Sequence, residues 1–305
     1  MGTLPGLGPE GAILRAEAGG YAVTAHARGA ALARLVGPSG RELVVPTPDD
    51  GPRIADAGAV LAPWPNRLED GVYRFQDAEH RVPVDEPERG NALHGLVRNL
   101  PWHVEDSDAS VIRLVTELPG REPYPFRLRL TARFAPAETG LDWTLTAENL
   151  GDRDAPYAAA LHPYLVGADW RADRRPASDD WTVVFPASLR LAVDERLLPT
   201  GTVPVAGTES DLRAPTRLGP RAFDFAGTGF PAGLHQAAVL DASGHGAAIA
   251  FRTDWAQLYT DDADGRRGVA IEPQTAPANA LRGHPDLIVL APGARHTLRC
   301  RILEV

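Results

Sequence analysis

Two residues far apart in the sequence, His162 and Glu272, carry side chains suited to general acid–base chemistry. His162 stands in the segment AALHPYLVG, where the following Pro163 biases its backbone towards an extended conformation. Glu272 follows the apolar run VAI and precedes another proline, so its carboxylate is expected to be partly buried and to need polar partners. An imidazole titrates at about pH 6.5, and a protein pocket can raise the pKa of a carboxyl towards that range. The two groups can therefore exchange protons with a substrate near neutral pH.

Two further residues extend this group. His94 lies beside a glycine in NALHGL, and Arg67 follows Asn66 after the turn PWP. Each residue has an ordinary explanation when taken alone: a hydrogen-bonded structural histidine, a solvated turn arginine, or, for His162, packing in the core. If the fold gathers His94 and Arg67 with the first two residues, it holds a carboxylate base, an imidazole acid and a cation that pairs with oxygen atoms.

The sequence speaks against several other kinds of site. Two histidines and a glutamate could bind a metal ion, but no His-x-His or His-x-x-x-His pair supports that use. The single cysteine, Cys300, excludes a disulfide within the chain and a zinc site built on several cysteines. All 31 basic residues are arginines, which excludes a Schiff-base lysine. No nucleophile elbow, phosphate-binding loop or dinucleotide-binding motif between strand and helix is present.

The composition is that of an ordinary globular protein. The 305 residues are 44% hydrophobic and 23% charged, and the net charge of −9 argues against nucleic acid or an anionic membrane as partner. The N-terminus does not have the pattern of a signal peptide. No apolar run reaches the roughly 18 residues that span a bilayer. We therefore expect a reduced, cytoplasmic location.

The elements that must position these residues are predicted to be strands. The 28 prolines and 30 glycines would interrupt most long helices, and FRLRLTARF alternates apolar and polar residues as a half-buried strand does. We expect an all-β sandwich or barrel, organised as one domain over residues 1–305 with about ten disordered residues at its start. The clearest strand segments are 20–27, 110–118, 126–134, 141–149, 181–186, 246–253, 286–293 and 295–305.

Five segments resemble the aldose 1-epimerase, or galactose mutarotase, family. They are PWPNRLEDGVYRF, NALHGLVR, LHPYL, VDERLLPTG and IEPQTAPANAL, and they occur in the family's order from about residue 20 to the C-terminus. The resemblance implies a large antiparallel β-sandwich, often called a supersandwich. It also implies an isomerase of carbohydrate metabolism that interconverts the α and β anomers of a free aldohexose. The family needs no metal or organic cofactor, and we expect a monosaccharide substrate and a monomer or homodimer.

The resemblance also implies a role for each residue. Glu272 would remove the proton of the anomeric hydroxyl, and His162 would protonate the ring oxygen. His94 and Arg67 match family positions that hold sugar oxygens. We expect Asn66 and Tyr164 to line the same site.

One stretch departs from the family pattern. The family has a Leu-Asp stretch whose carboxylate binds sugar hydroxyls, and the corresponding segment here is AGLHQAAVLD (232–241). His235 or Gln236 stands where the aspartate is expected, Asp241 comes too late, and Asp224 comes too early. We therefore expect His235 and Gln236 in the sugar site and a changed substrate preference.

Two alternatives remain open at this stage. A hexose-6-phosphate 1-epimerase on the same fold would need extra cations, which Arg171, Arg174 and Arg175 could supply from the polar segment RADRRPASDD. A carbohydrate-binding protein that kept the sandwich and lost catalysis would explain the departure at the aspartate.

Overall fold

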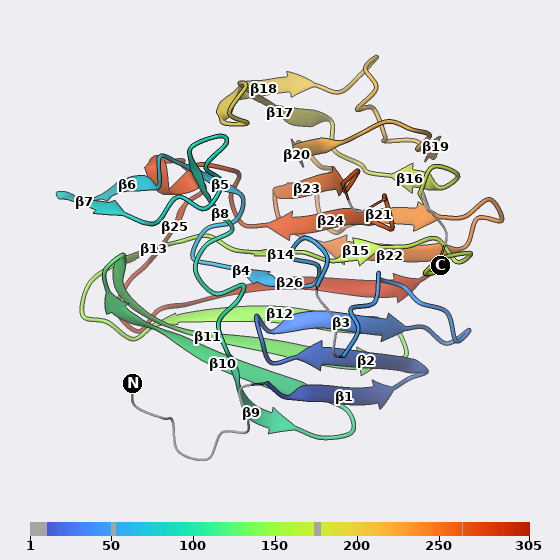
Figure 1. Ribbon diagram of the computed structural model, residues 1–305, viewed down its shortest axis with the longest axis horizontal. Coiled ribbons are helices and arrows are strands. Elements are labelled where there is room, and N and C mark those ends of the chain that lie inside the picture. The colour runs from blue at the N-terminus through green and yellow to red at the C-terminus, as the bar shows by residue number, and fades with distance from the viewer. Residues whose placement is uncertain (1–10, 50–52, 174–177, 264) are drawn as a thin grey trace.

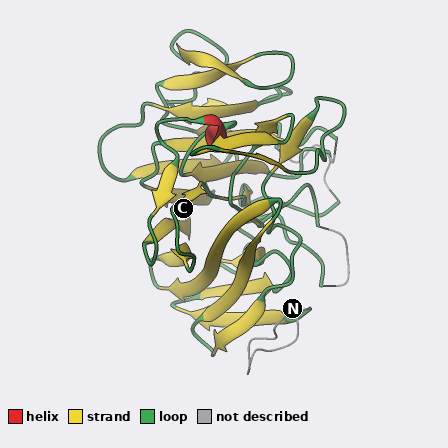
Figure 2. Ribbon diagram, turned by 90° about the vertical axis from the view of Figure 1, so that its left-hand side faces the viewer, coloured by secondary structure: helices red, strands yellow, loops and turns green. Residues whose placement is uncertain are grey.

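Short strands separated by turns make up nearly all of the described structure. The computed structural model describes residues 11–49, 53–173, 178–263 and 265–305. Within these residues the helical content is a single 3₁₀ turn, η1 (Ala280–Arg282), which Figure 2 shows in red. The all-β prediction is therefore confirmed. No helix among the described residues is long and apolar enough to cross a membrane.

Some sequence-based expectations are not tested. The initial residues expected to be disordered lie outside the described residues, as do Arg174 and Arg175. The single-domain assignment over residues 1–305 stays a prediction.

The larger of two main sheets has nine antiparallel strands. The predicted strand 126–134 forms the centre of β11, and its apolar residues are buried on one side of the sheet, as the alternation predicts. The strands, in their order across the sheet, are β19 (Thr216–Arg217), β16 (Thr182–Val184), β21 (His235–Leu240), β22 (Gly246–Phe251), β26 (Arg295–Glu304), β12 (Gly140–Asn149), β11 (Tyr124–Ala137), β10 (Ile112–Arg121) and β9 (His103–Ser107).

The second main sheet has eight antiparallel strands, which Figure 1 shows mostly in the upper half of the molecule. Two short strands, β14 and β15, flank His162 and both pair with β24. The strands are β18 (Pro199–Pro204), β17 (Leu189–Val193), β20 (Asp224–Thr228), β23 (Trp255–Thr260), β24 (Val269–Gln274), β14 (Ala160–Leu161), β15 (Tyr164–Leu165) and β4 (Val60–Leu61).

Smaller sheets complete the fold. A three-stranded sheet lies at the lower end in Figure 1, and three two-stranded pairs lie at the edges. These strands are β1 (Ile13–Ala18), β2 (Tyr21–His26) and β3 (Ala31–Val36), then the pairs β5 (Arg67–Glu69) with β8 (Asn91–Leu93), β6 (Val72–Phe75) with β7 (Ala78–Arg81), and β13 (Ala155–Tyr157) with β25 (Ile288–Leu290).

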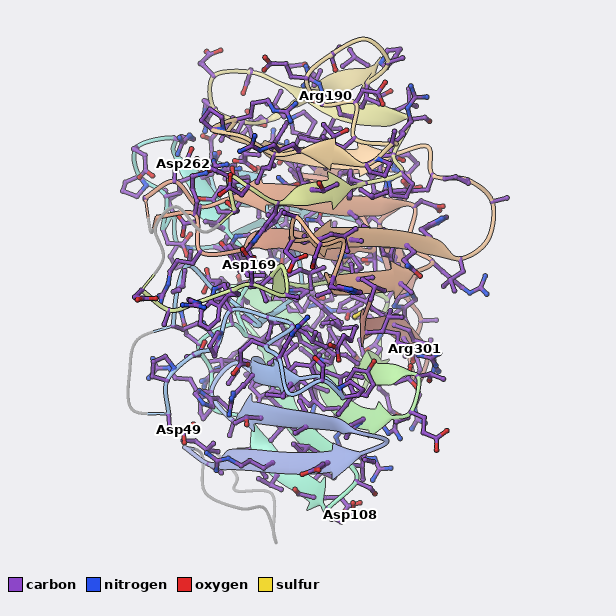
Figure 3. The ribbon with its side chains drawn as sticks, turned by 90° about the vertical axis from the view of Figure 1, so that its right-hand side faces the viewer. Asp49, Asp108, Asp169, Arg190, Asp262 and Arg301 are labelled. Carbon is purple, nitrogen blue, oxygen red and sulfur yellow. The ribbon has the colours of Figure 1, made fainter. Side chains whose placement is uncertain are left out.

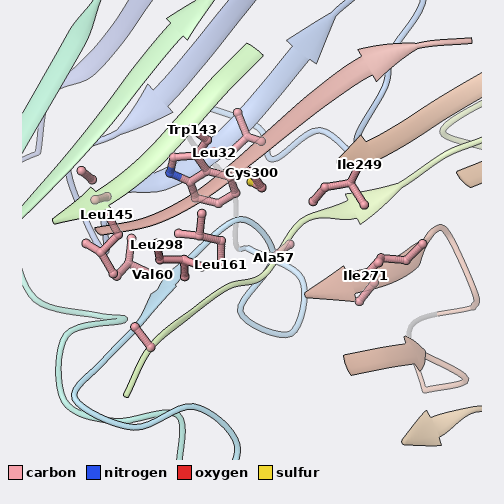
Figure 4. Packing of buried hydrophobic residues seen from close by; sticks show 14 of the residues in the cluster. Leu32, Ala57, Val60, Trp143, Leu145, Leu161, Ile249, Ile271, Leu298 and Cys300 are labelled. Carbon is pink, nitrogen blue, oxygen red and sulfur yellow. The ribbon is translucent and has the colours of Figure 1, made fainter. Parts of the chain in front are cut away.

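The main hydrophobic core lies between the nine-stranded sheet and the strands that cover it. In Figure 4, Trp143 and Leu145 of β12 lie near Val60 of β4 and Leu161 of β14, and all four belong to one buried cluster. Ile271 of β24 belongs to the same cluster. Burying one such side chain stabilises the fold by roughly 1.5–3 kcal/mol. Neighbouring residues on a strand point to opposite faces. Because Ile271 points into the core, Glu272 points to the other face of β24.

Candidate active site

A cavity of about 440 Å³ opens over the face of the eight-stranded sheet that carries Glu272. It gathers six of the eight predicted site residues: Asn66, Arg67, His94, His162, Tyr164 and Glu272. The other residues that line it are Ala55, Asp56, Glu86, Arg89, Leu93, Asp224, Gln257 and Tyr259. Segments that are distant in the sequence therefore meet at one place.

Strand register explains why side chains from four strands share this face. Asp224 of β20 is opposite Tyr259 of β23, which is opposite Ala270 of β24, which is opposite Tyr164 of β15. Two residues further along β23 and β24 from Tyr259 and Ala270, Gln257 is opposite Glu272. Side chains repeat their direction every second residue, so these polar groups all project from the same face.

Asn66 and His94 hold each other at the side of the cavity. Their φ angles, 55° and 60°, lie in the left-handed region, and Asn is among the residues that tolerate it best. His94 N donates to Asn66 O at 2.9 Å, and Asn66 N donates to Nδ1 of His94 at 3.2 Å. Because Nδ1 accepts this bond, the neutral His94 ring carries its proton on Nε2. Burial, and secondly His162, lowers the pKa of His94 well below its usual value.

His162 and Glu272 face each other inside the cavity. Nε2 of His162 lies 3.4 Å from Oε1 of Glu272, and the two side chains are only 4% and 2% exposed. The ring of Tyr164 stacks on His162 with centroids 5.2 Å apart, and His94 packs edge-on at 5.5 Å. These contacts fix the plane of the His162 imidazole. Nδ1 of His162 and Oε2 of Glu272 are buried and have no hydrogen-bond partner in the described structure.

Burial shifts the pKa values of His162 and Glu272 in opposite directions. It lowers the pKa of His162 to about 4. It raises the pKa of Glu272 well above the ordinary range, and the negative charge of Asp224 adds to this rise. Both shifts favour the uncharged forms, so burial favours a pair that holds one proton, as a neutral carboxyl beside a neutral imidazole. Moving that proton from Oε1 to Nε2 gives a carboxylate base and an imidazolium acid.

Glu86 orients Arg67 towards the cavity. Its carboxylate accepts from Nε of Arg67 at 3.0 Å and from Nη2 at 3.0 Å, and it also accepts from Asn91 Nδ2 at 3.0 Å. The remaining Nη1 of Arg67 lies 3.6 Å from Oδ2 of Asp224. Arg67 therefore points one end of its guanidinium into the cavity while the other end is fixed.

Asp224 and Gln257 continue this polar wall. Gln257 Nε2 donates to Oδ1 of Asp224 at 2.5 Å, and Asn66 Nδ2 donates to the amide oxygen of Gln257 at 3.2 Å. The side chain of Asp224 is 32% exposed, so one oxygen is open to a ligand. This chain of amide and carboxylate groups can bind a row of hydroxyls.

The placement of His235 and Gln236 in this site is wrong. Both belong to β21 of the nine-stranded sheet and neither lines the cavity. His235 stacks on Phe230 at 4.9 Å, and Gln236 is exposed. The carboxylate of this wall comes from Asp224, because β20, not β21, pairs with β23.

A local signal for Asp224 is present in the sequence. Phe223 and Phe225 are both buried in the core, so the residue between them must point to the opposite face of the strand. The motif FDF is therefore a strand with one polar group turned away from the core. Gln257 and Glu86 carry no comparable local signal. Their roles depend on contacts made across the fold.

Other candidates lie outside the cavity. Arg171 is exposed and does not line it. Asp241 caps a surface turn, where its Oδ1 accepts from Ser243 N at 2.8 Å. In the part of the chain that the structure describes, no three histidine, cysteine or carboxylate side chains form a candidate metal site.

Comparison with known proteins agrees with this geometry. A family model described as aldose 1-epimerase matches residues 13–303. The uncharacterised protein YihR of Escherichia coli K12 is 30% identical over 291 residues, which cover 94% of this chain and 92% of that protein. Human galactose mutarotase is 31% identical over 180 residues, which cover 57% of this chain and only 50% of the human protein.

Solved structures share the fold. A GalM/aldose epimerase homologue from C. elegans superposes with a TM-score of 0.83 at 17% identity, covering 96% of this chain and 98% of the other. Galactose 1-epimerase from Lactobacillus acidophilus gives a TM-score of 0.76 at 21% identity, covering 94% and 92%. With the match of the family model over nearly the whole chain, these findings show that the chain belongs to the aldose 1-epimerase family.

Proposed function

We propose that this protein is an aldose 1-epimerase that interconverts the α and β anomers of a free aldohexose. The observation that carries the proposal is the contact of 3.4 Å between His162 Nε2 and Glu272 Oε1, inside a cavity of sugar size. Opening a hemiacetal ring requires one proton to leave the anomeric hydroxyl and one to reach the ring oxygen. A base and an acid that share one proton supply both transfers.

In the proposed reaction Glu272 takes the proton of the C1 hydroxyl as His162 donates a proton to the ring oxygen. The C1–O5 bond breaks, a carbonyl forms at C1, and the open-chain sugar rotates about C1–C2. In reclosure the C5 hydroxyl attacks the other face of the carbonyl, its proton returns to His162, and Glu272 reprotonates the new C1 oxygen. Each positioned proton transfer typically contributes about 10²–10⁴-fold to the rate.

The remaining lining residues would hold the sugar. His94 presents Nε2–H, Arg67 presents Nη1, and Asp224 presents a carboxylate oxygen, so the cavity offers donors and an acceptor to hydroxyl groups. Asn66 and Tyr164 complete the walls. We extend the proposal to a cytoplasmic enzyme of carbohydrate metabolism that acts as a monomer or homodimer without a cofactor.

The test is anomer exchange measured by polarimetry and by NMR on freshly dissolved α-glucose and α-galactose. The purified protein should accelerate exchange of at least one common aldose well above the spontaneous rate. No acceleration for any aldose would reject the enzyme, and sugar binding without exchange would identify a carbohydrate-binding protein. Glucose 6-phosphate measured in parallel separates a sugar-phosphate epimerase, which would turn it over faster than glucose.

A further inference from the structure

Asp56 is a carboxylate in the cavity wall for which the proposed proton transfers have no use. Arg53 Nη2 donates to its Oδ1 at 3.1 Å, and Arg98 Nη1 donates to its Oδ2. Its side chain is 14% exposed. Two guanidinium groups therefore fix one carboxylate in the wall of the cavity that also holds the acid–base pair.

The loop that carries Asp56 is bonded directly to the backbone of His162. Gly58 N donates to His162 O at 2.7 Å, and His162 N donates to Ala59 O at 3.2 Å. Within the loop, Ala59 N donates to Asp56 O at 2.9 Å. The positions of Asp56 and His162 are therefore coupled through the main chain.

The backbone at this loop is unusual. Ala55 and Asp56 have consecutive φ angles of 26° and 59°, in the left-handed region that costs a residue other than glycine about 1–3 kcal/mol. Such residues persist where the surrounding contacts determine them, and they concentrate at functional sites. The strain is retained here where the loop presents a carboxylate to the cavity.

Asp56 remains a fixed negative charge while its neighbours titrate. Burial alone would raise its pKa, but the positive charges near it, on His94 when that ring is protonated and on Arg98, bring the pKa below the usual value. Its charge in turn opposes the effect of burial, which lowers the pKa of His162. The charged and titratable groups around the His162–Glu272 pair are Asp56, Arg53, Arg98, His94, Tyr164, Asp224 and Arg67.

We propose that Asp56 is a positioning residue whose fixed charge retains the transferable proton on the His162–Glu272 pair. The inference rests on the proposed function, because it assigns how that pair keeps its proton. The pair works only while it holds one proton: a second proton removes the base, and loss of the first removes the acid. The negative charge of Asp56 extends the pH range in which the pair holds one proton towards higher pH.

The pH dependence of anomer exchange tests the inference. Asn has nearly the shape of Asp and tolerates a left-handed φ, so Asp56→Asn should fold. Removing a nearby negative charge weakens proton binding, so both apparent pKa values of the pair fall. The bell-shaped profile of kcat/KM should move to lower pH by about one unit, with a rate about tenfold lower on its alkaline limb. A merely structural role would lower the rate at every pH and leave both limbs in place, which would overturn the inference.

A second measurement does not depend on activity. NMR titration of the His162 imidazole, assigned with His162→Asn, should give a lower pKa in Asp56→Asn than in the wild type. An unchanged titration overturns the role of Asp56. If the wild type exchanges no sugar but the titration moves, the proposed function fails and the electrostatic role of Asp56 holds.

Two further variants test the direction of the pH shift and whether the shift is specific to Asp56. Arg53→Gln removes a positive charge from the same cluster, so it should move both limbs to higher pH. Asp49→Asn makes the same chemical change as Asp56→Asn at an exposed carboxylate, which Figure 3 shows at the surface, and should leave both limbs in place. Equal shifts in Asp49→Asn and Asp56→Asn would show a general charge effect and contradict the inference.

Discussion

The outer face of the nine-stranded sheet and the cavity face of the eight-stranded sheet both carry charged side chains on alternate strand positions. On the outer face the ion pairs are exposed to solvent. Arg301 contacts Asp142 at 2.7 Å, and Figure 3 shows Arg301 at the surface. In the cavity His162 and Glu272 are almost completely buried. Water screens the first kind of pair and leaves its members charged, whereas burial of the second kind changes which form carries the proton. The same alternation in the sequence therefore gives a solvated surface or a reactive site, according to what covers the sheet.

The largest effect is expected from the base. Glu272→Gln keeps the shape of the side chain and removes proton acceptance, so anomer exchange should fall by about 10²–10⁴-fold. NMR exchange spectroscopy with the substrate of the wild type measures this loss. Full retained activity would disprove the assigned role.

The same variant makes a prediction about stability. The folded pKa of Glu272 is raised, so the wild type loses the stability contributed by this carboxyl as pH rises from about 4.5 through the folded value. Glutamine does not titrate. Urea unfolding should therefore show Glu272→Gln gaining stability relative to the wild type between pH 5 and pH 8, and a relative loss would contradict the burial effect.

A substitution on the apolar face of the nine-stranded sheet should lower the free energy of unfolding by an amount that does not depend on pH. Leu145 is fully buried in the main core, so Leu145→Ala should lower the free energy of unfolding by about 2–5 kcal/mol. Urea unfolding at pH 6 and pH 8 should give the same loss. A strong dependence of that loss on pH would show that this core is coupled to the acid–base pair.

Asp224 should affect binding more than turnover. Losing a hydrogen bond that involves a charged group costs about 1.5–3 kcal/mol, so Asp224→Asn should raise KM by about 10–100-fold. Steady-state kinetics by polarimetry separates KM from kcat. The matched control is Asp241→Asn, which makes the same change in a surface turn outside the cavity and should leave KM unaltered.

The smallest effect is expected from the partly exposed ion pairs on the outer face of the nine-stranded sheet. Arg129 Nη2 lies 3.0 Å from Oε1 of Glu117 on the nine-stranded sheet. Arg129→Ala should change the free energy of unfolding by about 0–1 kcal/mol and leave kcat/KM unchanged. A larger loss of stability, measured by urea unfolding at low and high salt, would mean that this face is covered in solution.

The sequence alone determined the fold class and predicted most of the named residues of the candidate site. Period-two segments between glycine and proline turns are sufficient to predict strands, because alternation records which face is buried. His162, Glu272, His94 and Arg67 were found because each lies in a short segment that contrasts with its surroundings, and the structure brings all four into one cavity.

Tertiary structure alone decided which further carboxylates line the cavity with these four residues. Position along the chain favoured the region of His235, but the pairing of β20 with β23 placed Asp224 beside Gln257. Asp56 enters through a loop hydrogen-bonded to His162. The physical reason is that alternation tells which side of its own strand a residue occupies, whereas neighbours across a sheet are chosen by long-range pairing and packing, and burial then sets the proton affinity of each group.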